Sequence, residues 1–149
     1  MMTGEDEVVV RQMEERDLSE VCAIENITFS LPWSRESFLS SMRNDDHICL
    51  AAFCSGAVAG YGVMLCSFDE GEIALFAVRE DLRRLGIGSK LLEALMEKGR
   101  EKGTERFTLE VRKSNESAIR LYEKYGFKSV GVRKDFYEKP REDALIMWT

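Results

Sequence analysis

Two arginines followed by two closely spaced glycines stand out in the stretch LRRLGIGSKL, residues 82–91. An apolar-periodic segment starts directly after them, so the glycines stand where a helix is expected to begin. The first turn of a helix carries unpaired N–H groups and the positive end of the helix dipole. Glycine leaves that backbone open to a ligand, and Arg83 and Arg84 add positive charge. The stretch therefore predicts an anion site, and a pyrophosphate would use several N–H groups at once.

Three alternatives compete for these ten residues taken alone. A P-loop requires G-x-x-x-x-G-K-[ST], which is absent here. A dinucleotide-binding fingerprint requires a third small residue at the position that Leu91 occupies. A tight strand-to-helix turn with solvated arginines needs no ligand at all.

The composition limits the class of protein. At 149 residues, we expect one domain at residues 7–149 after a disordered tail at residues 1–6. A net charge of −6 argues against nucleic acid as a partner, because phosphate binding needs concentrated lysine and arginine. No apolar run reaches the ~18 residues of a membrane span, and the acidic N-terminus lacks a signal-peptide pattern. We therefore expect a cytoplasmic protein that makes no membrane contact.

The cysteines point to structure rather than to chemistry. Cys22, Cys49, Cys54 and Cys66 lie in apolar surroundings and form no C-x-x-C pair. We expect buried free thiols and no metal site. A nucleophilic pair of a cysteine with His47 stays open but has no support.

The hydrophobic pattern alternates between strand-like and helix-like segments in the order β-α-α-β-β-β-α-β-α-β-β. A strand on each side of the central helix implies a parallel pair there, and hairpins imply antiparallel pairs around it. We predict one α/β domain with a mixed, mostly antiparallel sheet of about seven strands and helices on both faces. Asp17, Ser34 and Asn115 are the expected N-caps of three of the helices. The expected strands are 8–12, 47–53, 57–68, 72–78, 106–112, about 128–137 and 143–148, with turns at 55–56 and 69–71; the expected helices are 17–29, 34–42, 87–102 and 115–125.

The motif R-x-x-G-x-G, here Arg83 to Gly88, resembles the coenzyme A pyrophosphate signature of the GNAT N-acetyltransferase superfamily. The expected element order is similar to the GNAT fold. Three further segments resemble the ribosomal-protein-alanine N-acetyltransferase family: LEVRKSNESAIRLYEKYGF at 109–127, FSLPWSRESF at 29–38 and REDALIM at 141–147. The resemblance covers nearly the whole chain and implies acetyl-CoA as co-substrate.

The resemblance also implies where acetyl-CoA binds. The strand before the glycine turn splays from its neighbour at a bulge and pairs with the pantetheine arm, which in this sequence corresponds to Phe76, Ala77 and Val78. Asn115 matches a residue that contacts the cofactor, although by itself it is a good N-cap. The segment that cradles the phosphates corresponds to Arg84, Leu85, Gly86, Ile87, Gly88 and Ser89.

By the same resemblance, Glu110 matches the general base and Tyr122 the general acid. A carboxylate near the acceptor takes the proton of the amine, directly or through water, and a phenol returns one to the departing thiolate. Taken alone, Glu110 reads as a solvated strand carboxylate and Tyr122 as a core residue. Glu72 is a second candidate carboxylate on the strand leading to the bulge.

The acceptor implied by the resemblance is the N-terminal α-amine of a protein, namely a ribosomal protein beginning with alanine. Roughly a tenth of α-amines are neutral at pH 7, against fewer than about one in a thousand lysines. One carboxylate is therefore enough for an α-amine. Trp33 and Tyr137 are expected walls of the acceptor groove, with ordinary packing as the alternative.

The sequence departs from the family pattern at three positions. Leu75 stands where many members carry Asn, Leu85 replaces a commonly basic or polar residue, and Arg141 takes a place often held by His. Leu75 and Arg141 lie toward the expected groove, so they bear on which acceptor is used. An acetyltransferase for lysine or a small amine, and a non-catalytic acetyl-CoA-binding module, stay open as alternatives.

Overall fold

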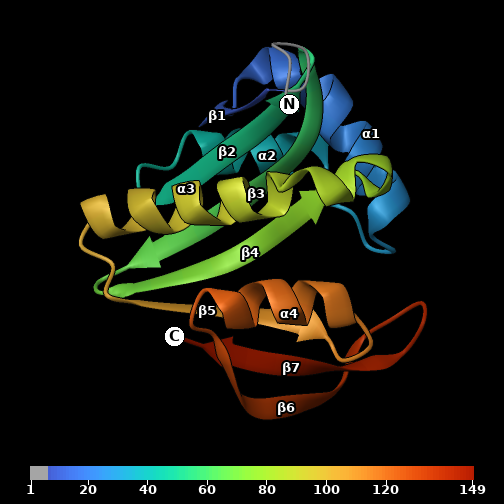
Figure 1. Ribbon diagram of the computed structural model, residues 1–149, viewed down its shortest axis with the longest axis vertical. Coiled ribbons are helices and arrows are strands. Elements are labelled where there is room, and N and C mark those ends of the chain that lie inside the picture. The colour runs from blue at the N-terminus through green and yellow to red at the C-terminus, as the bar shows by residue number, and fades with distance from the viewer. Residues whose placement is uncertain (1–6) are drawn as a thin grey trace.

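The computed structural model describes residues 7–149, which form a seven-stranded sheet in the order β1-β2-β3-β4-β5-β7-β6 (Figure 1). The predicted tail at residues 1–6 lies outside the described residues. The strands are Val8–Gln12 (β1), His47–Cys54 (β2), Ala57–Ser67 (β3), Glu70–Val78 (β4), Arg106–Arg112 (β5), Lys128–Tyr137 (β6) and Glu142–Trp148 (β7).

One pair of neighbouring strands, β4 and β5, is parallel, and the other pairs are antiparallel. In the sequence, these two strands lie on either side of the helix that follows the glycine turn, as the strand–helix–strand pattern predicted. The last strand, β7, lies between β5 and β6 rather than at the edge of the sheet. The predicted mixed, mostly antiparallel sheet is confirmed.

Helices cover both faces of the sheet. In Figure 1, α3 (Ile87–Glu101) lies in front of β2 and β3, and α1 (Leu18–Thr28) and α2 (Arg35–Met42) lie behind them. Buried side chains of α3 and α4 (Glu116–Lys124) form one core with one face of the sheet, and those of α1 and α2 form a second core with the other. We call these the α3–α4 core and the α1–α2 core. Short 3-10 turns, η1 (Glu15–Asp17) and η2 (Glu80–Leu85), precede α1 and α3.

The turn between β3 and β4 falls earlier than predicted. Phe68 takes a positive φ of 54° with its ring exposed, and Glu70 and Gly71 already belong to β4. Gly71 serves close packing instead, since a Cβ there would lie 2.9 Å from Sδ of Met64. The sequence pattern assigned this glycine to the turn because a turn residue and a residue in a crowded strand leave the same signal.

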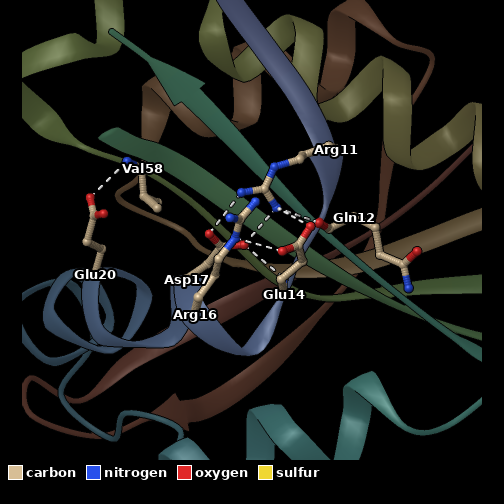
Figure 2. A network of polar contacts seen from close by, with 7 residues as sticks. All are labelled: Arg11, Gln12, Glu14, Arg16, Asp17, Glu20 and Val58. Carbon is tan, nitrogen blue, oxygen red and sulfur yellow. Dashed lines mark hydrogen bonds and ion pairs between the residues drawn. The ribbon is translucent and has the colours of Figure 1, made fainter. Parts of the chain in front are cut away.

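Asp17 sits at the start of α1, as predicted, but its side chain does not cap that helix. Its carboxylate accepts hydrogen bonds from Arg11 at 2.8 and 3.0 Å and from the backbone N–H of Glu14 at 2.8 Å (Figure 2). Glu20, one turn further on, accepts the backbone N–H of Val58 at 2.9 Å. These contacts attach the beginning of α1 to β1 and β3.

Two further predictions concern membrane-spanning segments and the state of the cysteines. Within residues 7–149, no helix has both the length and the apolar character that a membrane span requires. All four cysteines are free: Cys49 and Cys54 are buried, and Cys22 and Cys66 are half-buried.

The Arg11–Asp17 pair leads to a stability prediction. Burial opposes the charge of Asp17, but the bonds from Arg11 and the Glu14 amide lower the pKa of this carboxyl overall. A lowered folded-state pKa contributes stability above the unfolded value, about 4, and this contribution is lost as pH falls through the folded value. Asp17→Asn is therefore expected to lower the free energy of unfolding by about 2 kcal/mol at pH 7, and by much less at pH 3. Urea unfolding at both pH values measures this, and an equal loss at pH 3 would contradict it.

Candidate active site

A gap opens in the sheet where β4 and β5 separate. The two strands pair from Glu70 and Arg106 as far as Ile73 and Leu109, and the described residues show no β4–β5 pair beyond that point. The next residue, Ala74, is a β-bulge, because Ile73 faces Met64 and Leu75 faces Val63 on β3. Past the bulge β4 continues along β3, while β5 continues along β7, so the strands diverge (Figure 1). The splay implied by the family resemblance is present.

The bulge also exchanges the two faces of β4. Ile73 belongs to the α3–α4 core, whereas Leu75 and Ala77 belong to the α1–α2 core. Phe76 consequently packs toward α4, where its ring meets that of Tyr122 edge-on at 5.8 Å. One extra residue thus turns Phe76 toward the helix that carries the predicted acid.

The glycine turn follows at the end of β4. Gly86 has φ +72°, which favours glycine, and a Cβ there would meet nothing within 4 Å. Gly88 has a different use, because a Cβ there would lie 3.2 Å from Cδ2 of Leu121 on α4. Gly86 thus sets the backbone turn, and Gly88 permits the start of α3 to approach α4.

The N-terminus of α3 has no side-chain cap and no acidic residue in its first turn. Its first N–H groups, at Ile87, Gly88 and Ser89, have no partner within the helix by geometry, and they suit an anion. Leu85 is exposed beside them. The side chains of Arg83 and Arg84 lie outside the described part of the structure.

Asn115 caps α4, as predicted. Its Oδ1 accepts the backbone N–H of Ala118 at 3.3 Å. Because β4 and β5 run parallel, the α3 N-terminus and this cap lie at the same edge of the sheet. The candidate phosphate and cofactor contacts thus gather at one end of the gap.

Tyr122 is buried between two aromatic rings on the α3–α4 side. Its ring lies 5.8 Å from that of Phe76 and 5.7 Å from that of Phe127. Burial, and to a lesser degree the nearby Tyr137, raises the pKa of Tyr122 well above its usual value. The hydroxyl therefore keeps its proton across the physiological range.

Glu110 points to the opposite side of the sheet. Its neighbours Leu109 and Val111 belong to the α3–α4 core, and strand alternation directs Glu110 away from them. Its Oε2 is buried without a hydrogen-bond partner among the described residues, and Nε of Arg133 on β6 lies 3.5 Å from it. This carboxylate is therefore only partly partnered.

Tyr137, a predicted groove wall, connects the two candidate catalytic residues. Burial and then the charge of Glu110 raise the pKa of Tyr137 to about 12. After burial, the charge of Tyr137 contributes to the raised pKa of Tyr122. The ring of Tyr137 also carries the guanidinium of Arg112, 4.4 Å from its centroid. Tyr137 is therefore close enough to interact electrostatically with both Glu110 and Tyr122.

The other two predicted substrate residues lie further out. Glu72 is exposed on β4 before the bulge, opposite Thr108 and on the same face as Glu110. Trp33 is half-buried between α1 and α2, and its ring packs on Phe38 at 5.3 Å. Neither residue has a described contact with Glu110 or Tyr122.

Sequence reasoning missed Arg133 and Arg112. Arg112 lies on β5 itself, two residues after Glu110. Arg133 lies on β6, on the other side of the inserted strand β7, where Ala144 pairs with both Arg112 and Arg133. No local pattern signals that insertion. Within residues 7–149, no group of three or more His, Cys, Asp or Glu side chains could hold a metal ion.

Comparison with known proteins places this geometry in context. A family model described as "Acetyltransferase (GNAT) family" matches residues 16–127. The chain is 33% identical over 140 residues to the [ribosomal protein bS18]-alanine N-acetyltransferase of Escherichia coli (strain K12), covering 93% of this chain and 94% of that relative.

Solved structures with a similar fold include one of the same Escherichia coli enzyme class. The crystal structure of the Escherichia coli ribosomal-protein-S18-alanine N-acetyltransferase matches with a TM-score of 0.85 and 32% identity, covering 95% of this chain and 92% of that one. The structure of Ard1 from Thermoplasma volcanium matches with a TM-score of 0.86 and 30% identity, covering 95% and 96%.

The cap at Asn115 leads to a testable expectation. Asn115→Ala removes the acceptor of the Ala118 N–H and should lower the free energy of unfolding by about 1 kcal/mol. Asn115→Asp keeps an acceptor and should stay near wild type. Urea denaturation of both variants checks this, and equal losses in the two would show that the cap bond is not the cause.

Proposed function

The chain belongs to the GNAT acetyltransferase family, and from this premise we propose that residues 7–149 form one domain that acetylates the N-terminal α-amine of a protein, with Glu110 as base and Tyr122 as acid. The acceptor we propose is the N-terminal alanine of a small-subunit ribosomal protein. The observation that carries the proposal is the position of both residues at the point where β4 and β5 part. Glu110 directly follows the last β5 residue that pairs with β4, and Tyr122 packs on Phe76 just past the β4 bulge.

The residues at the gap fit acetyl-CoA as the acetyl donor. We place the pantetheine arm along β4 past the bulge, at Phe76, Ala77 and Val78, where β5 no longer runs beside this strand. The uncapped first turn of α3 suits the pyrophosphate, with Asn115 at the same edge of the sheet. The phosphate cradle we assign comprises Arg84, Leu85, Gly86, Ile87, Gly88 and Ser89.

Glu110 prepares the acceptor. An α-ammonium group must lose a proton before its nitrogen attacks the thioester carbonyl, and Glu110 accepts that proton directly or through a water molecule. An N–H group at the bulge stabilises the oxyanion of the tetrahedral intermediate. The nitrogen–carbon bond then replaces the carbon–sulfur bond, and no covalent enzyme intermediate is required.

Tyr122 completes the transfer by donating its proton to the departing coenzyme A thiolate. Burial that keeps the phenol protonated also disfavours a bare thiolate in the same surroundings. Proton transfer therefore accompanies cleavage of the carbon–sulfur bond. Placing Tyr122 and Glu110 on opposite faces of the sheet lets donor and acceptor approach from opposite sides.

The identity of the acceptor rests on two supports. The Escherichia coli relative, similar over nearly the full length of both chains, is named for ribosomal protein bS18 and alanine. One carboxylate also suffices for an α-amine, because its pKa lies about 2.5 units below that of lysine. Trp33, Glu72 and Tyr137 are the side chains that we assign to the acceptor side.

An acceptor panel tests this function. With acetyl-CoA and a short peptide starting Ala-Arg, we expect turnover, measured as acetylated peptide by mass spectrometry. The same peptide blocked at its α-amine and containing lysine should be left unmodified, as should spermidine. Mass detection avoids background from the four cysteines of the protein, which would react with a thiol reagent.

Each other outcome points elsewhere. Modification of the blocked peptide or of spermidine would move the acceptor to a side-chain or small amine. Binding of acetyl-CoA without turnover of any acceptor would favour the non-catalytic alternative and refute the assigned chemistry.

The catalytic assignment predicts losses in kcat rather than in cofactor affinity. Glu110→Gln should lower kcat about 100-fold, and Tyr122→Phe at least tenfold, with the acetyl-CoA Kd within about twofold of wild type. Steady-state kinetics and calorimetric titration of acetyl-CoA measure the two quantities.

Glu72→Gln is the matched control, because Glu72 is a carboxylate on the same face of the sheet. Its kcat should stay within about threefold of wild type. If Glu72→Gln lost activity while Glu110→Gln kept it, the base would be Glu72.

A further inference from the structure

A carboxylate is fully buried in α1, away from the reacting groups. Glu25 has 0% of its surface exposed, and a glutamate is almost never fully buried unless its carboxylate has partners. Its carboxylate accepts a hydrogen bond from the hydroxyl of Tyr61 on β3 at 2.6 Å and another from the backbone N–H of Trp33 at 2.9 Å. Burial raises the pKa of Glu25, which reflects the cost of keeping a charge there.

The bond to Trp33 fixes the loop at residues 29–34, which leaves α1 and enters α2. Glu25 lies on the last turns of α1 and reaches forward to the main chain at the far end of this loop. The Trp33 ring packs on Phe38, whose ring meets Tyr61 edge-on at 5.9 Å. Glu25, Tyr61, Phe38 and Trp33 therefore form one closed cluster that anchors the loop to β3.

The other end of the loop touches the acceptor side of the gap. Ser30 donates its hydroxyl to the carbonyl oxygen of Glu138 at 2.9 Å, and Arg112 donates to the same carbonyl at 3.2 Å. Glu138 follows Tyr137, whose pKa the charge of Glu110 raises. In Figure 1 the loop after α1 and the turn between β6 and β7 lie on the side toward which β4 and β5 diverge.

A buried carboxylate is a poor way to gain stability. Apolar side chains of similar volume often stabilise a core as well or better, because they carry no desolvation penalty. What Glu25 provides that an apolar residue cannot is a fixed position for the Trp33 backbone. A glutamate at this position is therefore best explained by a geometric requirement on the loop.

We propose that Glu25 is a positioning residue for the acceptor peptide: together with Tyr61 it fixes the loop at residues 29–34, so that this loop and the turn at residues 137–142 form one wall of the peptide groove. The proposal rests on the proposed function, since it assumes a peptide acceptor. It goes beyond that function by assigning peptide affinity to a residue that touches neither peptide nor acetyl-CoA.

The test separates peptide affinity from the rest of catalysis. Glu25→Met keeps the side-chain length but leaves Tyr61 and the Trp33 N–H without their acceptor. It should raise the KM for the Ala-Arg peptide at least tenfold and leave the KM for acetyl-CoA within twofold. Glu25→Gln retains an oxygen acceptor and should restore the peptide KM to within threefold of wild type.

Tyr61→Phe serves if Glu25→Met does not fold. It removes one of the two bonds and leaves the other, so the peptide KM should rise about threefold. An unchanged peptide KM in folded Glu25→Met, or in Tyr61→Phe where Glu25→Met fails to fold, would overturn the proposal.

Asp17→Asn is the matched control for destabilisation. It alters a buried carboxylate at the other end of the same helix, and it should leave the peptide KM within twofold of wild type. If Asp17→Asn raised the peptide KM as much as Glu25→Met, general loosening of α1 would explain both, and the specific role of Glu25 would fall.

Hydrogen exchange distinguishes this proposal from the proposed function. The Trp33 amide should exchange slowly in wild type and at least tenfold faster in Glu25→Met. If wild type acetylated no peptide, the proposed function and the peptide role of Glu25 would both be refuted, even with a protected Trp33 amide. Peptide turnover with an unprotected Trp33 amide would leave the proposed function standing and refute only the role of Glu25 in fixing the loop at residues 29–34.

Discussion

The β-bulge at Ala74 is the constraint on which the rest of the site depends. Side chains alternate along a strand with period two, so one extra residue exchanges the faces of everything that follows it. Ile73 packs under α3, while Leu75 packs under α1 and α2. β5 ends its pairing with β4 at the same level, so a gap opens at the centre of the sheet.

The gap determines what each neighbouring element contributes. Since β4 and β5 are parallel, the helices that follow them both start at the same edge, which brings Gly88 of α3 close to Leu121 of α4. β7 pairs with the other side of β5, where Ile146 lies opposite Glu110. In the proposed function, recognition of the acetyl donor therefore rests on backbone and helix termini, and the chemistry rests on side chains beside the gap.

The sequence was informative wherever a signal is local. The periodicity of α3, the Ser34 and Asn115 caps and the parallel strands around the glycine turn were all predictable from spacing and residue type. Asp17 was predicted to cap α1, but its carboxylate binds Arg11 and the Glu14 amide instead. Gly71 was predicted to lie in a turn, but it lies in β4, where its missing Cβ permits close packing. The residue type alone does not separate these uses. The family resemblance, rather than any pattern, pointed to Glu110 and Tyr122.

What could not be predicted depends on contacts between distant segments. The approach of Arg133 to Glu110 requires β7 to lie between β5 and β6, and the burial of Glu25 requires Tyr61 beneath α1. These contacts join residues that lie tens of positions apart in the sequence, and no periodicity encodes them.

In the proposed function, acceptor choice and donor binding therefore use separate parts of the fold. The donor side uses the bulge, the glycine turn and the N-termini of two helices. The proposed acceptor side uses the loops at residues 29–34 and 137–142, which are joined by the hydrogen bond from Ser30 to Glu138 and by a second hydrogen bond from Arg112 to the same carbonyl. A change of acceptor can be accommodated in these loops, or at neighbouring Arg141, while the geometry between Glu110 and Tyr122 is kept.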